Sequence, residues 1–510
     1  MSIYDVTTFG AIGDGVYDNS QAINNAIEAC ASHEGGTVYI PAGTYLCGPI
    51  VLSSHMTLEL EAGAVLLFHS DFNRYPAVAT RWSGYECYGF SPLIYGRDLQ
   101  QVTIKGRGII DGQGGPWWEA NQLLRQGGSI QNDVTRDIAI RNEVLTAKIK
   151  SNIVEWDSQF LRPPLLQLIH CEHVSIEGVT LQNSPFWNTH LVYCNNVHLH
   201  GINIKNPYHT PNGDGMDIDS CSNVRISDCT FDVGDDCLCI KSGIDEDGRR
   251  VGRPSENITI TNCTMMRGHG GVVLGSEMSG GIRNVTISNC IFMDTDRGIR
   301  MKTNRARGGY IRNILINNIY MENVFCPIAM NTFYRHGVDE SDPLISSPDA
   351  IEITESTPII EQISINQITA KGCRAGAGFI YGLPEMPIRD VQLSQVIIEM
   401  TTDPNEQGEE PDMVREKLIM AGDGMLCKHV QGLELSRVRI ETRQGPALIL
   451  EDSSDIDVNQ LRMKHVHPDT SVVKITRSDM VNVYGMQVVS LPRYVQADEQ
   501  SERTLQANGR

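Results

Sequence analysis

The stretch NVRISDCTF at residues 223–231 returns as NITITNCTM at 257–265 and as NVTISNCIF at 284–292. In each copy apolar and polar residues alternate, as in a short β-strand with one buried face. The first apolar position of this pattern recurs along the chain at Val102, Val174, Val197, Val224, Ile258, Val285, Ile314, Ile363, Val391, Leu433, Ile456 and Val481. We call these residues anchors. Their recurrence predicts a solenoid, in which each coil buries its apolar face against its neighbours.

Most neighbouring anchors are 23 to 34 residues apart, but three steps are longer. The long steps are 72 residues from Val102 to Val174, 49 from Ile314 to Ile363 and 42 from Val391 to Leu433. They predict loops or extra elements that leave the coils. We therefore predict an all-β fold, a right-handed parallel β-helix with long loop insertions, whose handedness follows the general preference of parallel crossover connections.

The expected organisation is a single β-helix domain over residues 1–495, followed by a disordered tail at 496–510. Residues 1–70 are predicted to form an N-terminal entry and cap, 99–330 the coils with the candidate site, and 331–495 additional coils. An amphipathic capping helix is predicted from Asn19 to Ala31, because apolar residues there recur at helical spacing.

Two further columns of residues accompany the anchors. Five residues after each anchor we expect interior side chains, namely Val179, Ile202, Cys229, Cys263, Cys290, Ile319, Ile368, Val396, Val438 and Leu461. One position earlier we expect residues at bends, namely Asp228, Asn262, Asn289, Asn318, Gln367 and Gln395. Both columns are interpreted as structural. Asn257, Asn262 and Asn284 also match the N-glycosylation pattern, and we interpret them as turn residues beside strands.

The net charge of −20 argues against nucleic acid or an anionic membrane as a partner, because the protein's field repels both. The first residues lack the basic and apolar regions of a signal peptide, and no later stretch approaches 18 uninterrupted apolar residues. We expect a cytoplasmic protein. Its 14 cysteines are then mostly free thiols packed as small hydrophobes. No metal or cofactor is expected, and the oligomeric state is left open.

Four polar clusters follow the strand pattern at comparable distances: Asn212-Gly-Asp214, Gly234-Asp235-Asp236, Gly268-His269-Gly270 and Arg300-Met-Lys302. Residues at equivalent places in successive coils lie on one face of a solenoid. Since neighbouring strands are about 4.8 Å apart, the clusters should span about 15 Å, enough for a few sugar units.

Close carboxylates repel one another, so one of Asp214, Asp235 and Asp236 should keep its proton while another stays ionised. This asymmetry is what glycoside hydrolysis requires. Gly234 permits a bend that could present both neighbouring aspartates on one side. The alternatives for the aspartate pair are a solvated turn or a metal site.

His269 lies between glycines that allow close approach of another molecule, although a lone histidine is more often structural. Arg300 and Lys302 alternate with Met301 and therefore face one way on a strand. A guanidinium and an ammonium together suit a substrate carboxylate. The alternative is a solvated basic edge. Trp117 and Trp118, in the first long step, either wall a groove or pack the insertion against the coils.

The segments NGDGMDID at 212–219, VGDDCLCIKSG at 233–243, RGHGGVVLGSE at 267–277 and RGIRMKT at 297–303 resemble the four signature segments of glycoside hydrolase family 28, the polygalacturonases. The resemblance is greatest to bacterial exo-polygalacturonases. It covers residues 3–330, and one departure is Gly213, where the family commonly has threonine; this should loosen the loop.

The resemblance implies an inverting glycoside hydrolase acting on acidic oligogalacturonides. Asp235 would be the general acid, Asp214 and Asp236 would be bases that activate water, and His269 would hold or tune the acid. Arg300 and Lys302 would bind a galacturonate carboxylate, and Asn212 and Gly270 would contribute to substrate binding.

We expect exo-action, because the excursions at 103–173 and 325–362 flank the catalytic coils and could close one end of a groove. The alternatives are an endo-polygalacturonase or a rhamnogalacturonan hydrolase. A pectate lyase, which shares the fold and uses calcium, and a non-catalytic carbohydrate-binding β-helix are less favoured.

Overall fold

The computed structural model describes residues 2–149, 153–335, 342, 346–414, 417–463, 470–488 and 495–508. Its contacts divide the chain into two compact units. Unit 1 contains Met1–Gly243 and Arg253–Cys263, and unit 2 contains Ile244–Gly252 and Thr264–Arg510. The prediction of one continuous domain over residues 1–495 stays a prediction, and each unit is described by itself.

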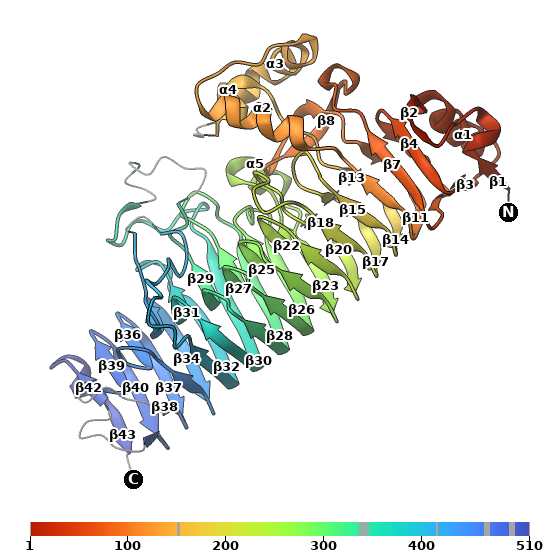
Figure 1. Ribbon diagram of the computed structural model, residues 1–510. Helices are drawn as coiled ribbons and strands as arrows, with labels where there is room; N and C mark the ends of the chain where they lie inside the picture. Colours follow the sequence, from red (N-terminus) through yellow and green to blue (C-terminus); the bar gives the residue numbers. More distant parts are fainter. Residues whose placement is uncertain are drawn as a thin grey trace. The chain divides into compact units, whose positions relative to one another are not determined.

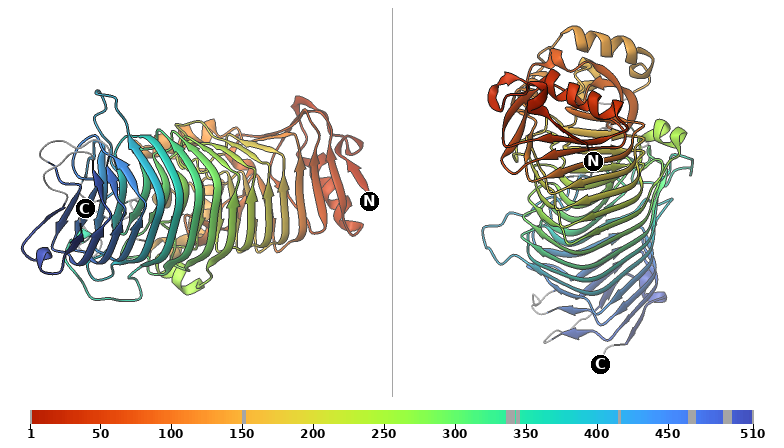
Figure 2. Two further views of the ribbon diagram at one scale, coloured as in Figure 1. Left: turned by 90° about the horizontal axis from the view of Figure 1, so that it is seen from below. Right: turned by 90° about the vertical axis from the view of Figure 1, so that its right-hand side faces the viewer.

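Unit 1 is built from three parallel ladders, whose strands appear one after another in Figures 1 and 2. The first ladder contains β1 (Ile3–Asp5), β3 (Gly36–Ile40), β6 (Met56–Leu60), β11 (Gln100–Gly106), β14 (Glu172–Glu177), β17 (Asn195–His200), β20 (Ser222–Ser227) and β23 (Ser255–Thr261). The second contains β2 (Asp14–Asp18), β4 (Gly43–Cys47), β7 (Ala64–Phe68), β12 (Ile109–Asp111), β15 (Thr180–Gln182), β18 (Asn203–Lys205) and β21 (Thr230–Asp232).

The third ladder of unit 1 carries part of the candidate site. It contains β5 (Ile50–Val51), β10 (Ile94–Arg97), β13 (Leu166–Ile169), β16 (Thr189–Val192), β19 (Met216–Asp219) and β22 (Asp236–Lys241). Outside the ladders lie the antiparallel hairpin β8 (Ala77–Trp82) and β9 (Tyr85–Phe90), the helices α1 (Ser20–Ser32), α2 (Gly115–Arg125), α3 (Asp133–Thr146) and α4 (Val154–Ser158), and the short 3-10 helices at Val6–Phe9 and Phe72–Arg74.

Unit 2 repeats the same architecture with longer strands. One side contains β24 (Thr264–Met266), β26 (Ile282–Met293), β28 (Tyr310–Glu322), β30 (Ile359–Cys373), β32 (Ile388–Met400), β34 (Val430–Ser436), β35 (Arg439–Glu441), β37 (Ser454–Asn459), β38 (Arg462–Met463), β40 (Asp479–Tyr484), β41 (Gln487–Val488) and β43 (Gln506–Asn508).

The other side of unit 2 is again one ladder that carries site residues. It contains β25 (Gly270–Gly275), β27 (Arg297–Lys302), β29 (Cys326–Asn331), β31 (Gly376–Tyr381), β33 (Asp423–Lys428), β36 (Leu448–Glu451), β39 (Val473–Thr476) and β42 (Val495–Ala497). The helix α5 (Asp245–Val251) and a 3-10 turn at Ser501–Arg503 complete the unit. The predicted parallel β-helix is thus confirmed.

The anchors pair with one another in constant register. In unit 1 the neighbours are Val102, Val174, Val197, Val224 and Ile258. In unit 2 they are Val285, Ile314, Ile363, Val391, Leu433, Ile456 and Val481. Every residue of the predicted interior column is at most 2% exposed. All 14 cysteines are buried free thiols, as predicted.

The predicted bend residues adopt left-handed backbone conformations, with φ between 55° and 58° at all six positions. Asn and Asp tolerate this region better than other residues with a Cβ atom. Their side chains form ladders within each unit, for example from Asn318 Nδ2 to Asn289 Oδ1 at 2.8 Å. Asn257 and Asn284 have the same left-handed backbone but lie within β23 and β26, so their interpretation as turn residues stays a prediction.

The N-terminal helix is confirmed as α1, whose apolar face is buried. The tail was predicted wrongly, because β42, the 3-10 turn and β43 occupy residues 495–508 and pair with β39 and β40. The open edge of the last coil offers unpaired backbone groups, and even a polar segment can satisfy them. No helix in the described ranges is long and apolar enough to span a membrane.

Trp117 packs the first insertion and does not line a groove. It is fully buried, and its ring contacts those of Phe72, Tyr75, Phe90 and Phe160. Trp118 is half-buried and donates from Nε1 to the Ser184 carbonyl at 2.9 Å. The packing alternative is therefore correct for Trp117. In Figure 1 the helices α2, α3 and α4 of this insertion lie together within unit 1.

Two adjacent residues of β28 test the prediction that side chains along a strand point alternately into the core and outward. Ile316 is 1% exposed and pairs in register with Ile287 and Ile365, whereas Leu315 is 54% exposed. We expect Ile316→Ala to destabilise the protein by about 2–5 kcal/mol because it leaves a cavity. Leu315→Ala should change stability by no more than about 0.5 kcal/mol. The midpoint of urea unfolding measures both, and equal shifts would contradict this assignment of faces.

Candidate active site

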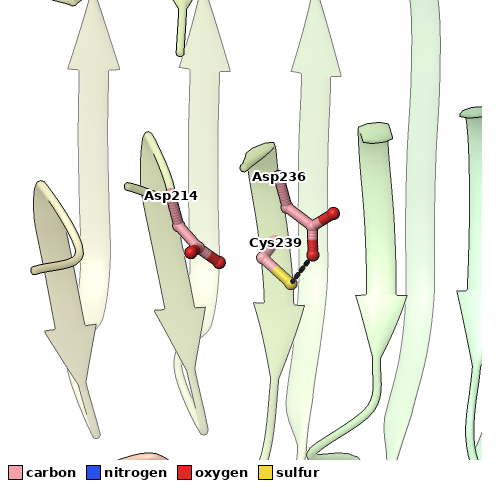
Figure 3. A group of neighbouring side chains, drawn as sticks. All are labelled: Asp214, Asp236 and Cys239. Atoms are coloured by element: carbon pink, nitrogen blue, oxygen red, sulfur yellow. Dashed lines mark hydrogen bonds between the residues drawn. The ribbon is translucent and has the colours of Figure 1, made fainter. Parts of the chain in front are cut away.

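Two of the three predicted catalytic carboxyls lie on neighbouring coils of unit 1. Asp214 is in the bend before β19, and Asp236 is the first residue of β22. The two strands pair with Met216 opposite Leu238, and the Gly215 N–H donates to the Asp236 carbonyl at 2.9 Å. The ladder therefore places the two aspartates side by side, as Figure 3 shows.

Glycines permit this close approach. A Cβ atom on Gly215 would lie 2.4 Å from the Cys237 carbonyl oxygen, and one on Gly234 would lie 2.3 Å from that of Tyr208. Both contacts are with backbone atoms, which cannot move aside. Gly234 and Asp235 form a bend between β21 and β22, as predicted from the glycine. The Asp235 side chain then turns back and accepts from the Asp236 N–H at 2.9 Å.

Single atoms of Asp214, Asp236 and Cys239 all lie within 4.8 Å of one another. The Cys239 thiol lies 3.8 Å from Asp236 Oδ2 (Figure 3). Such a set could hold a divalent cation, which keeps the metal-site alternative open. It could equally hold one water molecule between the carboxylates, because each hydrogen bond needs only about 2.6–3.2 Å.

The carboxyls differ in burial. Asp214 is 4% exposed and Asp236 1%, whereas Asp235 is half-buried. The pKa of Asp214 is raised well above its usual range, first by burial and then by the negative charges of Asp235 and Asp217, with Lys241 opposing the shift. Asp214 is thus a carboxyl that keeps its proton to higher pH than an ordinary aspartate.

The face of β16, β19 and β22 that carries Cys239 also carries further buried charges. Lys241 Nζ lies 3.6 Å from Asp217 Oδ1 and 4.4 Å from the centre of the Trp187 ring. In the same layer, Asp219 accepts from Arg81 at 2.9 Å, and His190 Nε2 lies 3.4 Å from it. Burial lowers the pKa of His190, against the pull of Asp219.

Asn212 has a left-handed backbone with φ of 53°, and its side-chain oxygen accepts from Arg162 Nη2 at 2.9 Å. It therefore shapes the loop that carries Asp214. Gly213 does not loosen this loop as the resemblance suggested. A Cβ atom there would lie 2.8 Å from the side chain of the buried Thr210, so the glycine allows tight packing.

The predicted basic residues lie in unit 2. His269 has a 45% exposed side chain, and its Nε2 is 4.0 Å from Asp296 Oδ2. Asp296 in turn lies 3.3 Å from Arg297 Nη1. Gly270, the first residue of β25, is buried. His269 is therefore not a buried structural histidine.

Arg300 is 1% exposed, so the alternative of a solvated basic edge is wrong for it. Its Nε and Nη2 donate to Asp412 Oδ1 at 3.1 and 2.5 Å. Lys302 is 6% exposed, and both cations lie against the ring of Tyr334, at 5.4 Å for Arg300 and 5.1 Å for Lys302. Burial alone raises the pKa of Asp412, but Arg300 and Arg297 outweigh it and the pKa is lowered.

The sequence therefore located the principal candidates and missed several partners. Asp217 and Lys241 stand in the quoted motifs, at alternate strand positions that point to the same face as the site. Asp412 and Tyr334 lie in the long steps between anchors, where no periodic signal exists. The prediction that the carboxyl and the basic groups act on one substrate stays a prediction.

Comparisons with known proteins bear on both groups. The model of glycosyl hydrolases family 28 matches residues 150–407, and that of rhamnogalacturonase A/epimerase, pectate lyase-like proteins matches residues 3–84. A probable polygalacturonase of Vitis vinifera is 33% identical over 407 residues, which cover 77% of this chain and 73% of the relative.

Two further relatives have an exo-acting activity in their names. An exo-poly-alpha-D-galacturonosidase of Dickeya chrysanthemi is 29% identical over 346 residues, covering 63% of this chain and 55% of the relative. The crystal structure of a hyperthermoactive exopolygalacturonase from Thermotoga maritima is 32% identical, with a TM-score of 0.69, and the match covers 86% of this chain and 91% of that one. With the candidate carboxyls and the basic cluster all inside the matched segment, the chain belongs to glycosyl hydrolases family 28.

Proposed function

We propose that this protein hydrolyses α-1,4-galacturonosidic bonds in oligogalacturonides, by inverting general acid and base catalysis and from one chain end. The observation that carries the proposal is the cluster of Asp214, Asp235 and Asp236 on neighbouring coils, two of them within 4.8 Å of each other. Glycoside hydrolysis needs one protonated carboxyl and at least one carboxylate base. The named activities of the relatives support the same reaction.

In the proposed mechanism Asp235 is the acid, because it is the more accessible carboxyl and can reach a glycosidic oxygen. Its proton passes to that oxygen as the bond to the anomeric carbon breaks. A water held between Asp214 and Asp236 attacks the anomeric carbon from the opposite side and gives its proton to whichever of the two is ionised. The proton count is restored when solvent reprotonates Asp235 and removes the proton gained by the base.

The acidic substrate is the part of the proposal that rests on unit 2. Arg297, Arg300 and Lys302 are buried cations, and Asp296 and Asp412 balance two of these charges. The three cations thus stand together on β27. In a protein with a net charge of −20, a local group of cations favours the binding of a polyanion.

Exo-action is supported by the named activities of the two exo-acting relatives. It is also supported by residues 409–414, which lie on the outer face of β27 and β29. Asn331 donates to the Met413 carbonyl at 3.1 Å, and Arg297 donates to that of Glu410 at 2.8 Å. A segment fixed on this face limits how far a sugar chain can extend along it. The cytoplasmic location, like the absence of metal and cofactor, stays a prediction.

Replacing Asp235 by Asn tests the acid. The amide is nearly the same size and cannot donate a catalytic proton, so we expect kcat on a defined trigalacturonate to fall by about 10² to 10⁴. Asp228→Asn, at a bend that tolerates asparagine, is the matched control and should keep full activity. Wild-type turnover by the Asp235 variant would remove the assignment. An ultraviolet-absorbing unsaturated product would instead indicate a lyase.

Replacing Asp214 by Asn tests the buried carboxyl by its effect on stability. The pKa of Asp214 is higher in the folded protein than in the unfolded chain. Ionising Asp214 therefore costs more free energy in the folded state and destabilises it. The contribution of Asp214 to the free energy of unfolding is therefore fully present at low pH. It is lost as the pH rises above 3.8, the ordinary pKa of an aspartate. We expect Asp214→Asn to match the wild type in melting temperature near that pH and to exceed it at neutral pH. A wild type that is the more stable at neutral pH would contradict the raised pKa.

The product series from long polygalacturonate tests the mode of cleavage. If one end of the site is closed, galacturonate or one fixed short product accumulates from the first minutes and viscosity falls slowly. An early ladder of mixed lengths with a rapid loss of viscosity would show endo-cleavage. Chromatography of time points from one reaction gives both readouts, and the anomeric form of the first product tests inversion.

A further inference from the structure

Arg162 is a fully buried cation at the point where the first long insertion meets the loop before β19. It lies between α4 and β13 and is 0% exposed. Its Nη2 donates to Glu155 Oε1 at 3.0 Å and to Asn212 Oδ1 at 2.9 Å. Its Nη1 donates to the carbonyls of Pro185 and Pro211 at 2.9 and 2.8 Å. One side chain therefore joins helix α4 to two loops of the coils.

Glu155 fixes the insertion end of this link. It is 2% exposed, and its Oε1 also accepts from Nδ2 of Asn121, on α2, at 2.5 Å. The backbone of Arg162 is held as well, because its carbonyl accepts from Nε1 of Trp82, in the hairpin of β8 and β9, at 3.0 Å. The guanidinium of Arg162 is therefore supported by three elements of the insertion and the hairpin, all within unit 1.

The other end of the link is the loop that leads to Asp214. Asn206 Nδ2 donates to the Gly213 carbonyl at 3.0 Å, and the Asn188 N–H donates to the Asp214 carbonyl at 2.9 Å. These residues of the coils hold the last two residues of the loop, whereas Arg162 holds the two residues before them. Loss of Arg162 should therefore displace the loop without releasing it.

The stability of the fold does not account for a cation at this place. A buried ion pair is often no more stable than an apolar pair of the same volume. In addition, Arg162 Nε is buried and has no hydrogen-bond partner among the residues that the structure describes, which is unfavourable. Departures of this kind from a well-satisfied core are typical of functional sites.

We propose that Arg162 is a positioning residue: it fastens the loop that carries Asp214 to helix α4, so that the first insertion fixes the distance between Asp214 and Asp236. This inference rests on the proposed function, in which these two carboxyls hold the attacking water. It gives the insertion a role that does not require it to line a groove, in agreement with the burial of Trp117. Arg162 acts through the loop and is assigned no part in the chemical step.

Replacing Arg162 by Met tests the link. Methionine removes all four hydrogen bonds of the guanidinium. A displacement of about 1 Å at a reacting group can cost about 10² in rate. We therefore expect kcat on trigalacturonate to fall by about 10², while KM changes by less than about threefold because the change affects the chemical step. A variant with the kcat of the wild type would overturn the proposal.

Arg162→Lys separates the position of the loop from the charge of Arg162. Burial lowers the pKa of Arg162, and the charges of Glu155 and, more weakly, Asp214 oppose this shift, so the cation also interacts with Asp214. Lysine keeps the charge but lacks the planar fork of donors, so kcat should still fall by at least about tenfold. A lysine variant with the kcat of the wild type would show that only the charge matters and would overturn the proposal. Because it leaves Glu155 paired, this variant also serves where Arg162→Met does not fold.

A double-mutant cycle tests whether Arg162 acts through Asp214. In an Asp214→Asn background the carboxyl that Arg162 positions is already lost, so Arg162→Met should lower the residual kcat by less than about threefold. Galacturonate released from trigalacturonate over a day measures this residual rate. An equal fold loss of kcat in both backgrounds would show that Arg162 acts through the fold in general and would overturn the proposal.

Asn142→Ala is the matched control. Asn142 is 2% exposed and fixes α3 of the same insertion to β9, since its Nδ2 donates to the Tyr88 carbonyl and its Oδ1 accepts from the Tyr88 N–H, both at 2.8 Å. It should lower the melting temperature as Arg162→Met does but leave kcat within about twofold of the wild type. A loss of kcat equal to that in Arg162→Met would show that a weakened insertion, and not the link to the loop, lowers kcat.

The outcomes separate this inference from the proposed function. A wild type that releases no galacturonate defeats the proposed function. An active wild type whose kcat is unchanged in both Arg162 variants defeats only the role of Arg162.

Discussion

Parallel backbone pairing in constant register is the constraint on which the site depends. Each coil adds one strand to each ladder, so a residue's place in its coil decides its neighbours. The pairing of Met216 with Leu238 brings Asp214 beside Asp236, although they are 22 residues apart in sequence. The repulsion between the two carboxyls is opposed by backbone hydrogen bonds and by interior side chains buried on both strands.

The same ladder explains why the glycines matter. At 2.3–2.4 Å from neighbouring carbonyl oxygens, the Cβ positions of Gly215 and Gly234 are occupied by backbone. Any side chain would push the coils apart and separate the carboxyls they carry. The strand register decides which residues are neighbours, and the missing glycine side chains allow the two coils to lie close together. The geometry of the candidate site is therefore a property of strand ends and not of a flexible loop.

The features that could be predicted from the sequence are those that repeat. Anchors, interior residues and left-handed bends each recur once per coil, so an error at one position is corrected by the others. The aspartates and the basic pair could be found because they follow strands at fixed distances. Asp412 could not, since its position depends on how residues 409–414 fold back onto β27 and β29. The strand at 506–508 was missed for a related reason. A strand pairs with an open ladder edge through its backbone groups, and every sequence has these whatever its side chains.

The pKa of a buried carboxyl is shifted in opposite directions in the two units. In unit 1 burial and like charges act together on Asp214, and the single cation Lys241 opposes them, so the proton is held tightly. In unit 2 burial opposes ionisation of Asp412, but two guanidinium groups outweigh it, so the carboxylate stays charged. Asp214 and Asp412 are both buried, and their charged neighbours decide the direction in which the pKa of each is shifted. Each carboxyl is attached to a ladder of its own unit, or to a segment fixed on that ladder, so its charged neighbours are already in place in the folded protein.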